Sequence, residues 1–266
     1  MIASLPMYPI FRNDVEVLWS AIADGLRKRG VGQVPDQLLW PLEDLIGHMR
    51  RPDLLLGQTC GYPLVKMLSG AVRVVGAFRF TAPGCDGIRY SSTVIARSDD
   101  PAQDIIAFRG RRAAYNGTES QSGYNCLRAL VAPLADKGRF FGSTLKTGAH
   151  QSSMQAVAAG DADVAAIDCI SFAHICAVDP VLAKALRVVC LTESVPGLPL
   201  VTHKTATDED VAVLRAVLAD VVRDSALAES RARLLIDGFE PIEFEAYAEI
   251  AAMEQRAIDA GYPILN

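Results

Sequence analysis

The chain has 266 residues, a length that fits two lobes of roughly 100–150 residues each better than one simple domain. Half of the residues are apolar, so the chain can bury a full core. The net charge of −5 argues against binding to nucleic acid, which needs a basic surface. Charged residues interrupt every apolar stretch before it reaches the roughly 20 residues of a membrane span, so we expect no such span.

The first residues, Met1–Tyr8, lack the basic and long apolar segments of a signal peptide. We therefore expect a cytoplasmic protein as the sequence stands, or a periplasmic one if a leader was removed. None of the six cysteines belongs to a C-x-x-C pair, and we expect neither a metal site nor a cofactor. Cys60 and Cys85 each lie beside a glycine in a predicted loop, which makes them the candidates for a disulfide.

Short apolar runs alternate with segments of helical period from the first residues onward. Ile2–Pro6 is a predicted strand, and Asn13 with Glu16 is the predicted capping box of a helix that Gly30 ends. The same patterns predict helices at 41–49 and 62–68, and strands at 53–57, 72–80 and 89–96.

The alternation continues in a second block. It predicts strands at 111–115, 140–142, 164–168 and 186–190, and helices at 123–134, 151–159 and 171–178. An apolar stripe from Val211 to Val221 and the segment 247–260 predict two further helices. Alternating strands and helices indicate a largely parallel sheet with helices on both faces. In such sheets a ligand binds at the carboxyl ends of the strands, where loops lead into helices.

The segment from Asn116 to Gly123 follows a predicted strand and opens a predicted helix. Ser120 and Ser122 can cap that helix, and Gly123 lets its backbone come close to a ligand. The first N–H groups of a helix have no internal partner and lie at the positive end of the dipole, so they can bind an oxyanion. An ordinary serine cap without a ligand is the alternative.

Three further junctions of the same kind carry polar residues. His150 directly precedes a predicted helix, where it either donates to an anion or acts in acid–base chemistry, or is only a cap or surface residue. Asp168 ends a predicted strand, where it takes the cationic part of a ligand or caps the following helix. The third junction is a loop that either faces the ligand or is purely structural, and its candidate residues are Gln58, Thr59 and Tyr62.

Taken in order, these motifs resemble the phosphonate-binding family of ABC-transporter substrate-binding proteins. The resemblance covers about residues 50 to 200. Its segments are the loop that ends in Tyr62, the strand 108–114, Ser120-Gln121-Ser122-Gly123, Gly148-Ala149-His150, and Gly160 to Asp168. The chain departs from the family at Gln121, where phosphonate receptors usually carry Thr.

The resemblance implies an α/β fold of the two-lobed periplasmic-binding-protein type 2, each lobe a mostly parallel sheet flanked by helices, with the ligand cleft between the lobes. Lobe 1 would hold residues 1–92 and 191–266, lobe 2 residues 93–190, with hinge crossovers near 90–96 and 191–199. By carry-over, an oxyanion is held by Ser120, Gln121, Ser122, Gly123 and His150. The rest of the ligand is lined by Tyr62 and Asp168, with Tyr8 and Tyr90 as walls.

We therefore expect a solute-binding protein that captures a small anionic or zwitterionic ligand, such as a phosphonate or a phosphate-like oxyanion. An ABC permease is the further partner that the resemblance implies. The alternative hypothesis is a cytoplasmic enzyme on the same fold, with His150 and Asp168 in acid–base chemistry. The effector domain of a transcription regulator is disfavoured, since the chain has no room for a DNA-binding motif before its first strand.

Overall fold

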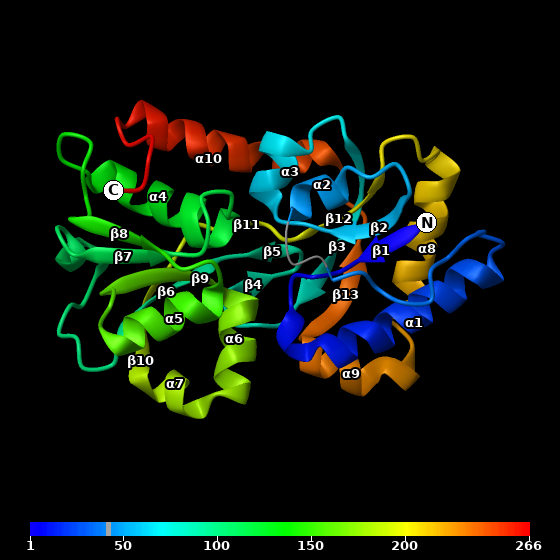
Figure 1. Ribbon diagram of the computed structural model, residues 1–266, viewed down its shortest axis with the longest axis horizontal. Helices are drawn as coiled ribbons and strands as arrows, with labels where there is room; N and C mark the ends of the chain where they lie inside the picture. The colour runs from blue at the N-terminus through cyan, green and yellow to red at the C-terminus, as the bar shows by residue number, and fades with distance from the viewer. Residues whose placement is uncertain (41–43) are drawn as a thin grey trace. The chain divides into compact units, whose positions relative to one another are not determined.

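The computed structural model describes residues 1–40 and 44–266, and its chain divides into two compact units (Figure 1). Unit 1 consists of Met1–Thr81, Asp86–Arg89 and Pro196–Ala248. Unit 2 consists of Ala82–Cys85, Tyr90–Val195 and Glu249–Asn266. Three short strands lie along the segments in which the chain passes from one unit to the other, and they form a small sheet in the order β11 (Val195–Pro196), β5 (Arg89–Tyr90), β4 (Cys85–Asp86).

The sheet of unit 1 has the order β1 (Ile2–Ser4), β2 (Leu54–Gln58), β12 (Pro199–His203), β3 (Val72–Phe80), β13 (Ile236–Glu240). Strands β1 and β2 are parallel, whereas β12 is antiparallel to both β2 and β3, and β13 is antiparallel to β3. The expectation of a mostly parallel sheet is wrong for this unit. The reason is that β12, from late in the chain, inserts between β2 and β3 in the opposite direction.

The helical segments of unit 1 are η1 (Pro9–Phe11), α1 (Arg12–Lys28), α2 (Leu45–Met49), α3 (Gly61–Met67), α8 (Asp208–Val221), η5 (Ser225–Leu227), α9 (Ala228–Leu234) and η6 (Phe244–Tyr247). Helix α1 packs against α8 and α9. Its apolar face is buried, as its period predicted, and consists of Val15, Leu18, Trp19, Ile22 and Leu26. Of the helix predicted at 41–49, residues 41–43 lie outside the described residues.

The predicted capping box at the start of α1 is wrong. The 3-10 turn η1 leads directly into the helix, so Phe11 is the N-cap and makes no side-chain cap. Glu16 accepts a hydrogen bond from Trp40 Nε1 at 2.5 Å instead. The end of the helix is as predicted, because Gly30 takes the left-handed conformation with φ of 81°.

The sheet of unit 2 has the order β10 (Leu186–Leu191), β6 (Ser92–Arg97), β9 (Val164–Asp168), β7 (Arg112–Tyr115), β8 (Ser143–Lys146). Strand β7 is parallel to β8 and β9, while β6 is antiparallel to β9 and β10, so this sheet too is mixed rather than mostly parallel. The strand predicted at 140–142 is wrong. Phe140 and Phe141 are buried in the core, and their N–H groups bond to Asn266 O at 3.1 and 2.9 Å.

The helical segments of unit 2 are η2 (Ile105–Phe108), the π-helical turn η3 (Gln121–Asn125), α4 (Cys126–Val131), η4 (Ala132–Leu134), α5 (His150–Ala159), α6 (Cys169–Val178), α7 (Pro180–Ala185) and α10 (Ala248–Asp259). Helix α4 lies on the opposite face of the sheet from α5 (Figure 1). Because β7, β8 and β9 are parallel, their carboxyl ends meet at one edge, and they lead into η3, α5 and α6.

The C-terminal segment from Glu249 to Asn266 belongs to unit 2, whereas we expected all of 191–266 in lobe 1. A buried arginine on α4 explains the difference. Arg128 Nη1 donates to Pro263 O at 2.7 Å, and its Nη2 lies 3.4 Å from Glu254 Oε1. Arg128 also donates to Asn125 Oδ1 at 2.6 Å. The contacts with Pro263 and Glu254 join the C-terminal segment to α4.

We predict that Arg128→Met lowers the free energy of unfolding by about 3 kcal/mol, because it removes the buried Arg128 guanidinium from the largely buried Glu254 carboxylate and from Pro263 O. Arg256→Met is the matched control, since the Arg256–Glu193 pair is 55% and 58% exposed and surface pairs contribute under about 1 kcal/mol. Urea unfolding followed by circular dichroism measures both variants. Equal effects would show that Arg128 does not hold the C-terminal segment.

Candidate functional site

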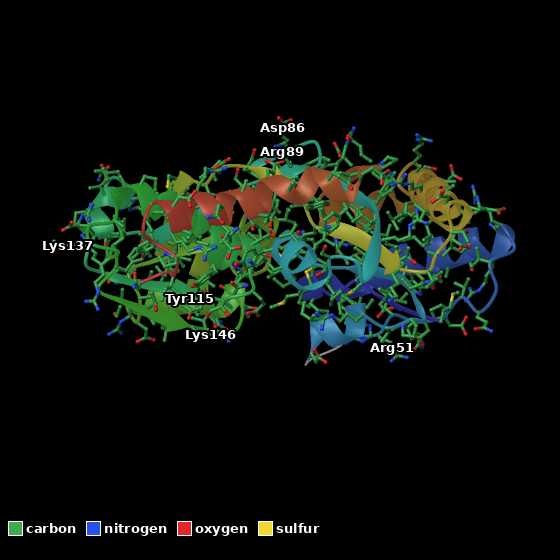
Figure 2. The ribbon with its side chains drawn as sticks, turned by 90° about the horizontal axis from the view of Figure 1, so that it is seen from above. Arg51, Asp86, Arg89, Tyr115, Lys137 and Lys146 are labelled. Carbon is green, nitrogen blue, oxygen red and sulfur yellow. The ribbon has the colours of Figure 1, made fainter. Side chains whose placement is uncertain are left out.

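The edge of the unit 2 sheet at the carboxyl ends of β7, β8 and β9 carries the polar residues that the sequence singled out. Tyr115 ends β7 and lies opposite Lys146, which ends β8. Figure 2 shows both side chains on these adjacent strands, and Lys146 is exposed. The residues that follow these strands form what we call the anion cluster: Asn116, Ser120, Ser122, Gly123 and His150.

Ser120 caps the helical segment that follows β7, as predicted. Its Oγ accepts a hydrogen bond from Gly123 N at 3.0 Å. The segment then runs without a break through η3, α4 and η4, from Gln121 to Leu134. Its first turn is π-helical, a geometry that is frequent at functional sites. The N–H groups of this first turn provide the positive end of a helix dipole at the cluster.

Ser122 and His150 are in direct contact, although they come from different segments. Ser122 Oγ lies 2.9 Å from His150 Nε2. Gly123 makes the approach possible, because a Cβ atom there would lie 2.0 Å from Asn116 Oδ1 and 3.3 Å from His150 Cε1. We predicted that a ligand comes close to the backbone of Gly123. In the structure, the side chains of Asn116 and His150 come close to it.

His150 is uncharged at neutral pH. Burial lowers its pKa from 6.5 to about 4. Its Nδ1 and the Oδ1 of Asn116 are both buried without a hydrogen-bond partner among the described residues. Buried polar atoms nearly always have a partner, so these two atoms beside Gly123 are candidates for contact with a ligand. Sequence reasoning missed Asn116, whose signal was its position directly after a strand.

Gln121 does not point toward the cluster. Its side chain is fully buried, with Nε2 at 3.2 Å from Cys126 Sγ and 3.4 Å from Met253 Sδ. Its Oε1 accepts a hydrogen bond from Asn125 Nδ2 at 2.8 Å. The amide is held between α4 and α10, so the structure places Gln121 in the core rather than in contact with a ligand.

Asp168 caps a helix and also lies near the cluster. Its Oδ1 accepts a hydrogen bond from Ser171 N at 2.8 Å, the capping alternative of the sequence analysis. Ser92 is its neighbour across the β6–β9 ladder, and Ser92 Oγ donates to Ser122 O at 2.9 Å. Ser92 therefore connects the end of β9 with the start of the helical segment, and Asp168 remains a candidate for ligand contact.

Unit 1 has its own polar edge at the carboxyl ends of the parallel strands β1 and β2. Ser4 ends β1 opposite Gly57, and Thr59 directly follows β2. Both side chains are fully buried, and neither Oγ of Ser4 nor Oγ1 of Thr59 has a hydrogen-bond partner among the residues that the structure describes. We call these two side chains the hydroxyl pair. Ser4 was missed by the sequence analysis, although it is the first polar residue after the apolar start of the first strand.

The remaining predicted site residues are buried in one unit or the other. In unit 1 these are Tyr8, Gln58 and Tyr62. Tyr8 packs edge-on against Phe80, with ring centroids 5.5 Å apart. Tyr90 is buried in unit 2. Whether Tyr8 and Tyr90 form walls of one ligand site stays a prediction.

The proposed pairing of Cys60 with Cys85 is wrong, since none of the six cysteines takes part in a disulfide. Cys60 is the N-cap of α3 in unit 1, whereas Cys85 belongs to unit 2. The neighbour of Cys85 is Cys169, with the two sulfur atoms 3.5 Å apart. Among the described residues, no group of three or more His, Cys, Asp and Glu side chains is placed to hold a metal ion.

The sequence matches the model of the family described as ABC transporter, phosphonate, periplasmic substrate-binding protein over residues 42–247. The chain belongs to this family. The assignment confirms the resemblance and favours the solute-binding hypothesis over the enzyme alternative. No helix in the described part of the chain is long and apolar enough to cross a bilayer.

Solved structures of low sequence identity share the fold of this family member. One is a binding protein component of an ABC phosphonate transporter from Pseudomonas aeruginosa, with a TM-score of 0.77 and 20% identity over 98% of this chain and 88% of that one. Another is PhnD1 from Prochlorococcus marinus in complex with methylphosphonate, with a TM-score of 0.76 and 13% identity over 96% of each chain. A third is XAC2383 from Xanthomonas citri bound to ATP, with a TM-score of 0.74 and 17% identity over 98% of each chain. No curated protein sequence matches the chain.

We predict that His150 makes the free energy of unfolding depend on pH between about 4 and 6.5. In this window the unfolded chain binds a proton at the imidazole and the folded chain does not, so stability falls as the pH falls from 6.5 toward 4. Between pH 7 and pH 4.5 the loss is roughly 2 kcal/mol. His150→Gln removes this part of the dependence.

Urea unfolding at both pH values measures the effect, with His203→Gln as control because that ring contacts Thr205 at the surface. The difference between wild type and His150→Gln isolates His150 from the other groups that titrate in this window. An unchanged pH dependence in His150→Gln would mean that the imidazole is charged in the folded protein.

Proposed function

We propose that this member of the phosphonate-binding family binds a small phosphonate-like oxyanion at the anion cluster. The contact between Ser122 Oγ and His150 Nε2 at the start of a helical segment carries the proposal. It places a hydroxyl, an imidazole and backbone N–H groups at one point. A tetrahedral oxyanion accepts several hydrogen bonds at once, and the start of a helix offers them together with a favourable dipole.

The tautomer of His150 depends on which group donates the hydrogen in its contact with Ser122. If the Ser122 hydroxyl donates to Nε2, the proton of the neutral imidazole lies on Nδ1, which is buried and has no partner among the described residues. An anion near the ring favours the protonated form, so anion binding raises the pKa of His150 from its low value. The exposed Lys146 at the same sheet edge adds a positive charge that attracts an anion.

Two of the solved relatives support a phosphorus oxyanion as the ligand class. PhnD1 is in complex with methylphosphonate and XAC2383 is bound to ATP, and both ligands carry a phosphorus oxyanion. The family description further supports an ABC permease as partner and a periplasmic location. For the organic part of the ligand, Asp168 and the tyrosines Tyr8, Tyr62 and Tyr90 remain candidates.

We predict that a phosphorus oxyanion stabilises the wild-type protein against heat and does not stabilise Ser122→Leu. The panel holds methylphosphonate, phosphate, phosphite, ATP, sulfonates and carboxylates. At about 100 times its dissociation constant a ligand adds about 2.7 kcal/mol, which raises the melting temperature by about 5–10 °C in a protein of this size. The leucine side chain fills the space in front of His150, so the shift is lost.

Ser98→Leu is the control, because Ser98 is exposed in the same unit. A retained shift in Ser122→Leu would remove the anion cluster from consideration while leaving the family assignment intact. A shift by carboxylates alone would contradict the phosphorus class.

We predict that Thr59→Val weakens ligand binding about three- to tenfold and stabilises the ligand-free protein by about 1 kcal/mol. The reason is that a buried hydroxyl without a partner costs free energy in the folded state, and an isosteric methyl group removes that cost. The loss of affinity follows if the Thr59 hydroxyl donates to the ligand. Isothermal titration calorimetry and urea unfolding measure the two effects.

Thr202→Val is the matched control in the same unit, because the buried Thr202 Oγ1 donates to Leu54 O at 3.2 Å. This variant loses a hydrogen bond and is destabilised by about 1 kcal/mol. An unchanged dissociation constant in Thr59→Val would show that the Thr59 hydroxyl takes no part in binding.

A further inference from the structure

The thiols of Cys85 and Cys169 meet, although they are separated by 84 residues in the chain. Their sulfur atoms are 3.5 Å apart, which is van der Waals contact. A disulfide bond needs about 2.05 Å between the sulfur atoms, so the two sulfur atoms must come closer by about 1.5 Å to form one. We propose that Cys85 and Cys169 form a disulfide when the protein meets a low-molecular-weight disulfide as oxidant.

Backbone hydrogen bonds fix the two segments beside each other. Cys169 N donates to Ser91 O at 3.3 Å, and Ser91 N donates to Gly84 O at 2.9 Å. The segment of Cys85 and the segment of Cys169 are therefore both hydrogen-bonded to Ser91. All these residues belong to unit 2, so the contact does not depend on the other unit.

Gly84 allows the two segments to come this close. It has φ of 103°, a conformation that side chains other than glycine rarely adopt. A Cβ atom at this position would lie 3.1 Å from Cys169 Cβ, closer than such atoms normally pack. The glycine directly before Cys85 thus brings the backbone against Cys169.

The exposure of the two thiols sets the order of the reaction. Cys85 is partly exposed, and the turn that follows it reaches the surface, as Asp86 and Arg89 show in Figure 2. Cys169 is 1% exposed, and the contact with Cys85 together with burial raises the pKa of its thiol. The oxidant therefore reacts first at Cys85.

The reaction balances with the oxidant alone. Cys85 attacks one sulfur of the small disulfide and releases one thiol, which leaves a mixed disulfide on Cys85. Cys169 then gives up its proton, attacks the Cys85 sulfur and releases the second small thiol. Two cysteine thiols lose two electrons and two protons, and one small disulfide becomes two thiols.

The disulfide between Cys85 and Cys169 would fix the segment Ala82–Cys85, after which the chain passes from unit 2 to unit 1. Cys85 is the last residue of unit 2 before Asp86, which belongs to unit 1. After oxidation Cys85 is covalently bound to Cys169, and the next residue, Asp86, already belongs to unit 1. The bond would also anchor the residue next to Asp168, the cap of α6.

The experiment treats the folded, full-length protein with oxidised glutathione and counts thiols after denaturation. We expect wild type to fall from six free thiols to four, and tryptic mapping without reductant to join the peptides of Cys85 and Cys169. The melting temperature of the oxidised protein rises, and dithiothreitol reverses the rise.

Variants separate this pair from the other cysteines. Cys85→Ser and Cys169→Ser form no internal disulfide, whereas Cys60→Ser and Cys176→Ser still lose two thiols. Wild type that keeps six thiols, that stops at a glutathione adduct, or that joins another pair of cysteines would overturn the proposal. None of these outcomes bears on the proposed anion site, which contains no cysteine.

Discussion

The parallel pairing of β7 with β8 and β9 is the constraint on which the candidate site depends. Parallel strands end at the same edge of a sheet, so three segments that are distant in the chain continue from one place. Asn116 follows β7, His150 opens the helix after β8, and Asp168 ends β9. Without this pairing Ser122 and His150, which lie 28 residues apart, would have no reason to meet.

The anion cluster offers a ligand hydrogen bonds and a helix dipole rather than a buried charge. Burial keeps His150 neutral, and the residues around it are serine, asparagine and glycine. A buried cation without its anion would be costly, whereas neutral donors tolerate the ligand-free state. The same principle appears in unit 1, where the hydroxyls of Ser4 and Thr59 are buried and uncharged. A protein with a net charge of −5 can thus bind an anion, since local donors and dipoles act at short range.

Two glycines allow close contacts in unit 2, one at the anion cluster and one at the pair of cysteine thiols. At Gly123 the missing side chain makes room for Asn116 and His150, and at Gly84 it brings the backbone against Cys169. In each case the important property is the absence of Cβ, which lets segments that are far apart in sequence approach within contact distance. The anion cluster and the thiol pair both belong to unit 2, and both depend on such an approach.

The sequence by itself determined the features that depend on neighbouring residues. Apolar period placed most strands and helices, Gly30 and Gly160 ended helices with positive φ, and Ser120 capped the segment where an anion was expected. Three features were decided only by the tertiary structure. The side chain of Gln121 turns inward toward Met253, and Cys85 lies against Cys169 rather than Cys60. The C-terminal segment packs beside Arg128. These contacts join residues about 80 to 135 positions apart. Local patterns cannot predict them, because they are set by how whole sheets and helices pack, and the insertion of β12 between β2 and β3 has the same cause.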